Sequence, residues 1–144
     1  MILSKKDLKF YLQEDAKQNG VKTGWRYYAY LIAGSENYHA YRYIKCLRHY
    51  EYHLNTSHRL RYIFYKIKLG RLGLKYNIRI KPNVCGYGLR IIHLAGGGGV
   101  LLNAKKIGNY CAFNSGVLLG NKNENDACPT IGDHVAFAQG SKAC

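Results

Sequence analysis

One histidine and a run of four glycines stand together in the stretch YGLRIIHLAGGGG, which covers residues 87–99. His93 lies in an apolar run, and an imidazole titrates near neutral pH and can take a proton from a hydroxyl group. Gly96–Gly99 carry no side chains, so a ligand can lie directly against their backbone N–H and C=O groups. The stretch therefore predicts a site in which His93 is a general base beside a bare backbone surface.

Other interpretations of these residues stay open. His93 can be a packed histidine whose ring nitrogens are satisfied by the backbone. The glycines can cradle a phosphate, but no Lys-Ser or Lys-Thr pair follows them as in a P-loop. The remaining histidines are expected to lie away from the chemistry. We expect four of them to lie on solvated helix faces: His39, His49, His53 and His58. We expect the fifth, His134, to point outward from a corner of the chain.

From about residue 78 the apolar residues repeat with a period of six. A single register holds across this half and misses only at Asn125, with its members at Leu89, Ala95, Leu101, Ile107, Phe113, Leu119, Ile131, Phe137 and Ala143. Neither a helix nor an alternating strand has this period, whereas a coil of short parallel strands with three repeats per turn does. We therefore expect a β domain over residues 76–144.

Residues 1–75 have helical spacing instead. Apolar residues three and four apart form one stripe over residues 40–54 (Tyr43, Ile44, Leu47, Tyr50, Leu54) and another over residues 58–69 (Leu60, Ile63, Phe64, Ile67). The predicted organisation is a basic helical region over residues 1–75 followed by the β domain.

The formal net charge is +14, and most of the excess lies before residue 82. Such a charge fits nucleic acid, an anionic membrane face or a polyanionic small ligand as partner. The five cysteines are odd in number and include no C-x-x-C pair, which argues against a disulfide framework and against a metal site. The N-terminus has no signal-peptide core, and no apolar stretch is long enough to span a bilayer, so we expect a cytoplasmic protein.

The hexads, with GYGLRIIHLAGGGGVLLN and PTIGDHV, resemble the serine acetyltransferase-like branch of the hexapeptide-repeat acyltransferases, above all its capsular and lipopolysaccharide-cluster members. The resemblance is strong over residues 78–144 and weaker over YRYIKCLRHYEYH. It implies a mainly β protein with a helical N-terminal part, built as a left-handed parallel β-helix, a homotrimer, and acetyl-CoA as donor. His93, which follows Gly86-Tyr87-Gly88, matches the family's general base. The chain ends partway through a coil, so we expect the C-terminal coils to be truncated.

Three departures from serine acetyltransferases argue against free serine as acceptor. Ile92 stands where they have an aspartate before the histidine, and Arg79 stands where they have an aspartate three residues before Pro82. Ala127-Cys128-Pro129 replaces their Arg-His-Pro. A zwitterion needs charges facing both its ends, which these residues do not supply.

The function expected from the resemblance is acetyl-CoA-dependent O-acetylation of a hydroxyl group, on a sugar of a capsule or surface polysaccharide precursor. His93 would be the base, and the donor would lie along Ala95, Gly96, Gly97, Gly98 and Gly99 without a metal. The hexad gap would form an acceptor loop that includes Asn121, Asn123, Asn125, Asp126 and Cys128. The alternatives are L-serine O-acetylation in cysteine biosynthesis and a non-catalytic basic oligomer that binds nucleic acid or a membrane. Peripheral contact of the Tyr-rich basic helices with anionic lipid is expected ahead of nucleic-acid binding.

Overall fold

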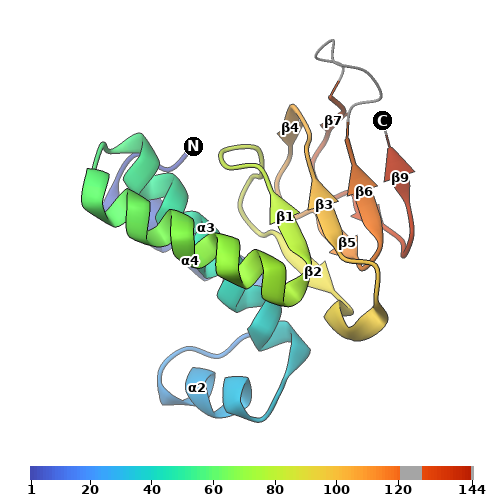
Figure 1. Ribbon diagram of the computed structural model, residues 1–144, viewed down its shortest axis with the longest axis horizontal. Coiled ribbons are helices and arrows are strands. Elements are labelled where there is room, and N and C mark those ends of the chain that lie inside the picture. The colour runs from blue at the N-terminus through green and yellow to red at the C-terminus, as the bar shows by residue number, and fades with distance from the viewer. Residues whose placement is uncertain (121–127, 144) are drawn as a thin grey trace.

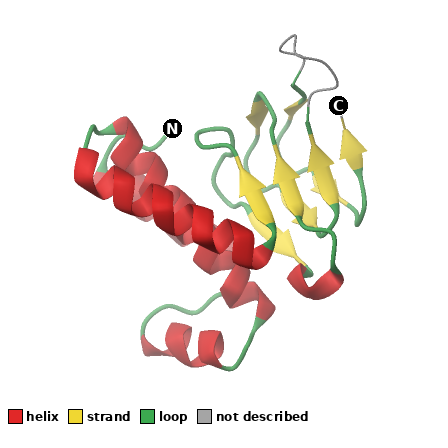
Figure 2. Ribbon diagram, viewed as in Figure 1, coloured by secondary structure: helices red, strands yellow, loops and turns green. Residues whose placement is uncertain are grey.

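The structure is a computed structural model and describes residues 1–120 and 128–143. Helices fill the first half and lie on one side of the molecule, and short strands fill the second half and lie on the other (Figures 1 and 2). The helices are α1 (Lys5–Gln18), α2 (Trp25–Ile32), α3 (Glu36–Asn55) and α4 (Arg59–Tyr76). The strands are β1 (Ile78–Ile80), β2 (Arg90–Ile92), β3 (Val100–Leu102), β4 (Lys106–Ile107), β5 (Ala112–Asn114), β6 (Val117–Leu119), β7 (Thr130–Ile131), β8 (Ala136–Phe137) and β9 (Lys142–Ala143), with a 3₁₀ turn, η1 (Leu94–Gly96), between β2 and β3. None of the helices within the described ranges is long and apolar enough to cross a membrane.

The helix predicted over residues 40–54 is confirmed as α3. Tyr43, Ile44, Leu47 and Tyr50 are buried as the stripe predicted, whereas Leu54 at the end of the helix is exposed. These buried side chains share one hydrophobic core with residues of the strands, such as Ile78. The largest core is therefore shared between the helical and β regions, and two smaller clusters lie within the helical region alone.

The helix predicted over residues 58–69 is present as α4, but its inward face was assigned wrongly. Leu60, Ile63, Phe64 and Ile67 are all exposed. The face that packs on the core consists instead of Tyr62, Tyr65, Leu69, Leu72 and Tyr76. Tyrosines pack well through their rings and keep the hydroxyl near water, so a row of tyrosines can serve as the inner face.

All pairings between strands in residues 1–120 and 128–143 are parallel. One sheet has the order β1-β3-β6-β9, a second has β2-β5-β8, and the third pairs β4 with β7. Consecutive strands belong to different sheets, so the chain moves from sheet to sheet. At least one strand of another sheet therefore lies between any two successive strands of the same sheet.

The helical N-terminal part is present as predicted, but the rest of the predicted fold class, a mainly β protein in the form of a left-handed parallel β-helix of hexapeptide repeats, is wrong. The structure shows four helices followed by short parallel strands in three small sheets. Three hexads per turn would separate paired strands by about 18 residues. Val100 pairs with Val117, 17 residues further on, but Ile78 pairs with Val100 at 22 residues and Ala112 with Ala136 at 24.

The six-residue register itself breaks at the glycine run. Ala95, expected to point inward, is exposed, and Leu101 lies half-buried between the fully buried Val100 and Leu102. The extra residues of the η1 turn shift the inward positions by one before β3 begins. Beyond β3 the register holds again at Phe113 and Leu119, which are fully buried.

Candidate active site around His93

His93 directly follows β2 and precedes the η1 turn. Its backbone lies in the left-handed region (φ 57°, ψ 56°), and its side chain is exposed. A non-glycine residue in this region costs roughly 1–2 kcal/mol, so the surrounding structure must hold it. The turn is held by the His93 carbonyl, which accepts a hydrogen bond from the Gly96 N–H, and by Leu94, which packs against the core. His93 is therefore presented to solvent at a defined corner.

A column of glycine backbone lies beside this corner. Gly98, Gly116 and Gly140 all have positive φ and stack on one another in successive passes of the chain. A Cβ atom on Gly98 would lie 3.1 Å from the Cα of Gly116, and one on Gly116 would lie 3.1 Å from the backbone nitrogen of Gly140. Close contacts exclude side chains at Gly98 and Gly116, and the positive φ of Gly140 disfavours one there, so this column presents a surface of backbone.

The hydrogen bonds around the turn show which backbone donors are free. The Ala95 N–H donates to the Glu36 carboxylate (2.9 Å), and the Gly96 N–H is used within the turn. The N–H groups of Gly97, Gly98 and Gly99 donate no hydrogen bond to any residue that the structure describes. Of the five residues predicted to line the donor site, Gly97–Gly99 thus keep backbone donors for a ligand, whereas those of Ala95 and Gly96 are occupied.

Three polar side chains lie at the turn that the sequence did not single out. Glu36, at the first position of α3, holds Ala95, and the Gln139 amide lies 3.4 Å from the Gly96 carbonyl. The Ser115 hydroxyl is buried, lies 2.6 Å from where a Cβ on Gly96 would be, and has no partner among the described residues. None of them has a helical or six-residue spacing to His93, so no sequence pattern could have found them.

The predicted acceptor loop falls mostly outside the described residues. Asn121, Asn123, Asn125 and Asp126 belong to the undescribed segment, and Cys128 lies just after it and is half-buried. A separate cleft of about 480 Å³ lies at the far end of β1 and β3 from the η1 turn and contains two basic side chains, Arg79 and Lys81. It can accept an anionic group. No group of three His, Cys, Asp or Glu side chains suited to a metal ion occurs among the residues the structure describes.

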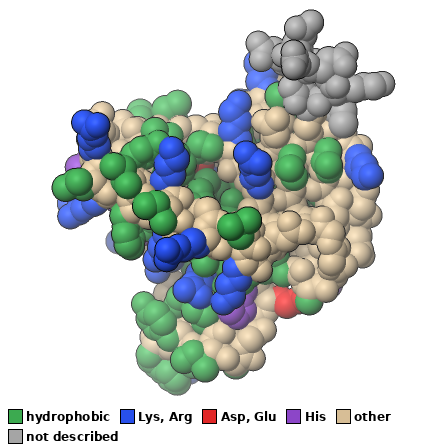
Figure 3. Space-filling view, viewed as in Figure 1, with side chains coloured by type: hydrophobic (Ala, Val, Ile, Leu, Met, Phe, Trp, Pro, Cys, Tyr) green, Lys and Arg blue, Asp and Glu red, His purple; other side chains and the backbone are tan. Residues whose placement is uncertain are grey.

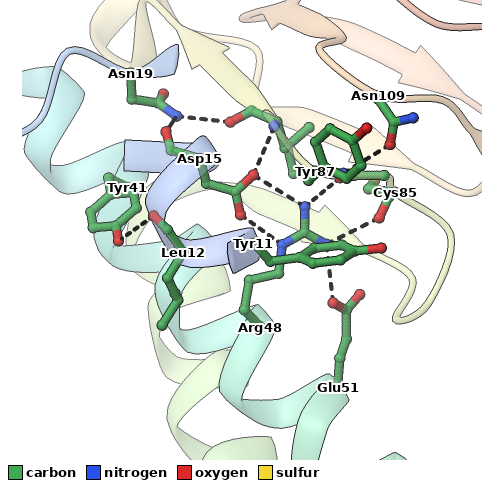
Figure 4. A network of polar contacts seen from close by, with 12 residues as sticks. Tyr11, Leu12, Asp15, Asn19, Tyr41, Arg48, Glu51, Cys85, Tyr87 and Asn109 are labelled. Carbon is green, nitrogen blue, oxygen red and sulfur yellow. Dashed lines mark hydrogen bonds and ion pairs between the residues drawn. The ribbon is translucent and has the colours of Figure 1, made fainter. Parts of the chain in front are cut away.

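The Gly86-Tyr87-Gly88 stretch before β2 is held by a buried ionic network (Figure 4). The guanidinium of Arg48 is fully buried and donates to Asp15 (2.8 Å), Glu51 (3.0 Å) and the carbonyls of Cys85 (3.1 Å) and Gly86 (2.6 Å). Burial alone would lower the pKa of Arg48, but Asp15 and Glu51 outweigh it and raise the pKa above its usual value. Arg48 of α3 therefore stays charged and links its own helix to α1 and to this stretch.

The same network reaches the strand that carries His93. Asp15 accepts from the Leu89 N–H (2.9 Å), and the Asn19 amide donates to the Leu89 carbonyl (2.7 Å). Both backbone groups of Leu89, four residues before His93, are thereby fixed by α1. Arg48 was not among the site residues singled out from the sequence. Its spacing of three from Glu51 inside an apolar helix was the one signal in the sequence.

His39 is half-buried, with its Nδ1 2.7 Å from the Tyr76 hydroxyl, so it does not lie on a solvated face as predicted. The prediction is also wrong for His49 and His53. His53 is buried, and His49 is half-buried and stacks on Tyr65 with ring centroids 5.0 Å apart. Burial, together with Lys45 and His53, lowers the pKa of His49 to about 4, and burial also lowers the pKa of His53. These rings are neutral packing groups in the folded protein.

This burial predicts acid sensitivity. Below a pH of about 6.5 the unfolded chain protonates His49, whereas the folded chain does so only near pH 4. The free energy of unfolding should therefore fall as the pH drops from about 6.5 to 4, and His49 contributes no further change below that range. Urea unfolding across this window checks it, with His49→Gln expected to flatten the slope. The exposed His134→Asn, in the β half, serves as the control, and an equal slope in all three proteins would contradict the assignment.

The glycine column predicts a graded response to alanine. Gly116→Ala should lower the free energy of unfolding by about 1 kcal/mol for its positive φ and by a further 1–2 kcal/mol or so for overlap with Gly140. Gly140 also has a positive φ, but there is open space around its Cβ position. Gly140→Ala should therefore lose only the contribution from the positive φ and none from overlap. Denaturant unfolding of the two variants tests the stack, which equal losses would rule out.

A scan against protein-family models found no match to the chain, and searches of curated proteins and of solved structures found none either. The resemblance to hexapeptide-repeat acyltransferases therefore depends on the quoted residues alone, and functional assignment depends on the geometry around His93.

Proposed function

We propose that the protein is an acetyl-CoA-dependent O-acetyltransferase with His93 as its general base. The observation that carries this proposal is the pairing of an exposed histidine with free backbone donors, because the N–H groups of Gly97 and Gly98 follow His93 within five residues. Acyl transfer to a hydroxyl needs a base for the hydroxyl proton and hydrogen-bond donors for the oxyanion. Both kinds of group occur at this corner.

In this proposal a ring nitrogen of His93 takes the proton as the hydroxyl oxygen attacks the thioester carbonyl carbon. The carbonyl oxygen becomes an oxyanion and accepts hydrogen bonds from the Gly97 and Gly98 N–H groups. The C–S bond then breaks as the carbonyl re-forms. The thiolate of CoA leaves and takes the proton back from the His93 imidazolium, so the base is restored.

The basic cleft at the far end of β3 supports an anionic donor. Arg79 and Lys81 line it together with Leu101, Leu102 and Asn103. Guanidinium and ammonium groups bind phosphate through charge-assisted hydrogen bonds. An extended donor that lies along β3 would place its phosphates here and its thioester near the η1 turn.

A sugar hydroxyl suits this site better than serine. The residue before His93 is the half-buried Ile92, and the Glu36 carboxylate is engaged by Ala95. Neither offers a free charge to a zwitterion. We place the reaction in the cytoplasm, at the inner membrane face where lipid-linked sugar precursors lie, and the homotrimer stays a prediction.

The test is thiol release from acetyl-CoA in the presence of hexoses, amino sugars or L-serine, corrected for the protein's own cysteines, with the product identified by mass. Acetylation of a sugar supports the proposal, and faster acetylation of L-serine favours the serine alternative. If no acceptor gives thiol release and calorimetry detects no CoA binding, the protein is not an acetyltransferase.

A further inference from the structure

The outward face of α4 is apolar although it covers no part of the chain that the structure describes. Five large side chains point to solvent on this face: Leu60 (85% exposed), Ile63 (44%), Phe64 (59%), Ile67 (55%) and Leu74 (89%). They recur at spacings of three, four and seven, which places them along one line of the helix. Contiguous exposed apolar surface of this kind marks a site of interaction in folded proteins.

The fold does not need this stripe. The opposite face of α4 already fills the space over α3 with Tyr62, Tyr65, Leu69 and Leu72. Tyr62 stacks on Tyr50 of α3, and Tyr65 stacks on His49 and His53 of the same helix. An outer face with polar residues would leave this packing unchanged, so the exposed apolar residues have another use.

Basic side chains border the stripe on both sides. Around the helix, Arg61, Lys68 and Lys75 lie along one edge of the stripe, and Arg59 and Lys66 lie along the other, with Arg71 inside it. The helix contains no aspartate or glutamate. In the space-filling view, Lys and Arg side chains alternate with hydrophobic ones over α4 (Figure 3).

The neighbouring helix α2 adds aromatic groups. Its eight residues expose Trp25 (76%), Tyr28 (62%) and Ile32 (87%). Hydrophobic side chains cover α2 on the same face of the molecule as α4 (Figure 3). Tryptophan and tyrosine are the side chains that favour the headgroup level of a membrane.

We propose that α4, together with the exposed side chains of α2, binds the surface of an anionic membrane. The apolar stripe would enter the boundary between headgroups and acyl chains, and the flanking lysines and arginines would extend along the helix to reach lipid phosphates. The helix lies flat on the bilayer and does not cross it. This binding does not depend on the acetyl transfer proposed above.

Charge decides among the possible occupants of this face. A second copy of the chain would bring two basic borders together, which opposes association. Nucleic acid would neutralise the charges, but its phosphate backbone would not bury a row of leucine, isoleucine and phenylalanine side chains. An anionic lipid surface satisfies the apolar stripe and its basic borders at once.

The experiment is co-sedimentation of the full chain with vesicles of phosphatidylcholine alone and with a rising share of phosphatidylglycerol, at low and physiological salt. We expect binding that grows with phosphatidylglycerol and weakens with salt. Ile67→Asp should weaken it about tenfold. The pair Lys66→Glu and Lys68→Glu should weaken it by about 25-fold or more, because each basic residue near the surface contributes about fivefold.

The matched controls lie on the β half. Leu118→Asp places the same charge on another exposed apolar position, and Lys105→Glu with Lys106→Glu makes the same change in net charge. Both controls should bind within about twofold of the unchanged protein. Equal binding to neutral and anionic vesicles, or equal losses in α4 variants and controls, would overturn the proposal. The proposal would also be overturned if the protein does not bind vesicles and the α4 variants instead lose self-association in light scattering. The same holds if they instead lose binding to DNA.

Discussion

Replacement of His93 by asparagine should reduce the rate of acetyl transfer about a hundredfold or more and leave the fold unchanged. Loss of a general base costs about 10² to 10⁴ in rate. Asparagine is the better substitution because His93 has positive φ (57°), which asparagine tolerates and alanine does not. The measurement is the steady-state rate of CoA thiol release with a saturating acceptor, beside circular dichroism of both proteins.

His134 provides a close control for this variant. It is also an exposed histidine with φ 57°, at a corner where it stacks on Tyr110 and not beside Gly97 and Gly98. His134→Asn should therefore keep the rate within a small factor. If His93→Asn and His134→Asn have the same rate as the unchanged enzyme, His93 takes no part in proton transfer. If both variants lose activity together with helical content, the loss of activity results from misfolding and not from the loss of a base.

Replacement of Arg48 by methionine should destabilise the fold by about 3–5 kcal/mol, because it leaves the carboxylates of Asp15 and Glu51 buried without their cation. This is a large share of the 5–15 kcal/mol or so that holds a domain of this size together. Two backbone carbonyls, of Cys85 and Gly86, would lose their donor as well. Urea unfolding followed by circular dichroism measures the loss.

Two further variants separate the network from general effects of charge. Arg48→Lys keeps the positive charge, but an ammonium group cannot donate to several acceptors in the planar arrangement of a guanidinium. The stability of Arg48→Lys should therefore lie between that of the unchanged protein and that of Arg48→Met. Arg42→Met removes a basic residue from the partly exposed side of α3 and should cost less than about 1 kcal/mol. A loss below about 1 kcal/mol for Arg48→Met would contradict the role given to the network.

The sequence predicted the buried face of α3 correctly and that of α4 wrongly, for a physical reason. In α3 a single row of apolar residues, such as Ile44 and Leu47, has helical spacing, and that row is the one buried. In α4 two opposite rows qualify, and the aliphatic row that includes Leu60 was chosen over the row that includes Tyr62 and Tyr65. Periodicity finds an amphipathic helix but does not tell which of two apolar faces meets the core.

The β half was predictable as short parallel strands but not as the fold class we expected. The six-residue period indicated strands that return to the same sheet, and all pairings between the described strands are indeed parallel. It did not reveal that the residues of η1 lengthen one pass, since a run of glycines has no hydrophobic pattern to read. Ala95, counted as an inward position, is the residue at which the register breaks.

The candidate site shows a similar limit. His93 and the glycines could be chosen because they are adjacent in sequence and chemically unusual. Glu36, which occupies the Ala95 N–H, lies 59 residues earlier, and Asp15, which pairs with Arg48, lies 33 residues before it. Partners at such separations leave no local pattern, so only the folded chain identifies them.

The long reach of the buried network also sets an order of events during synthesis. Asp15 binds the backbone of Leu89, 74 residues later, and Glu14 accepts from Tyr110, 96 residues later. A ribosome adds roughly 5–20 residues per second, so the N-terminal helices wait several seconds for these partners. During that interval Asp15, Arg48 and Glu51 remain hydrated, and the inner face of α3 has no strands to pack on. The outer face of α4 needs no later segment, so the nascent chain can reach an anionic surface before the corner around His93 exists.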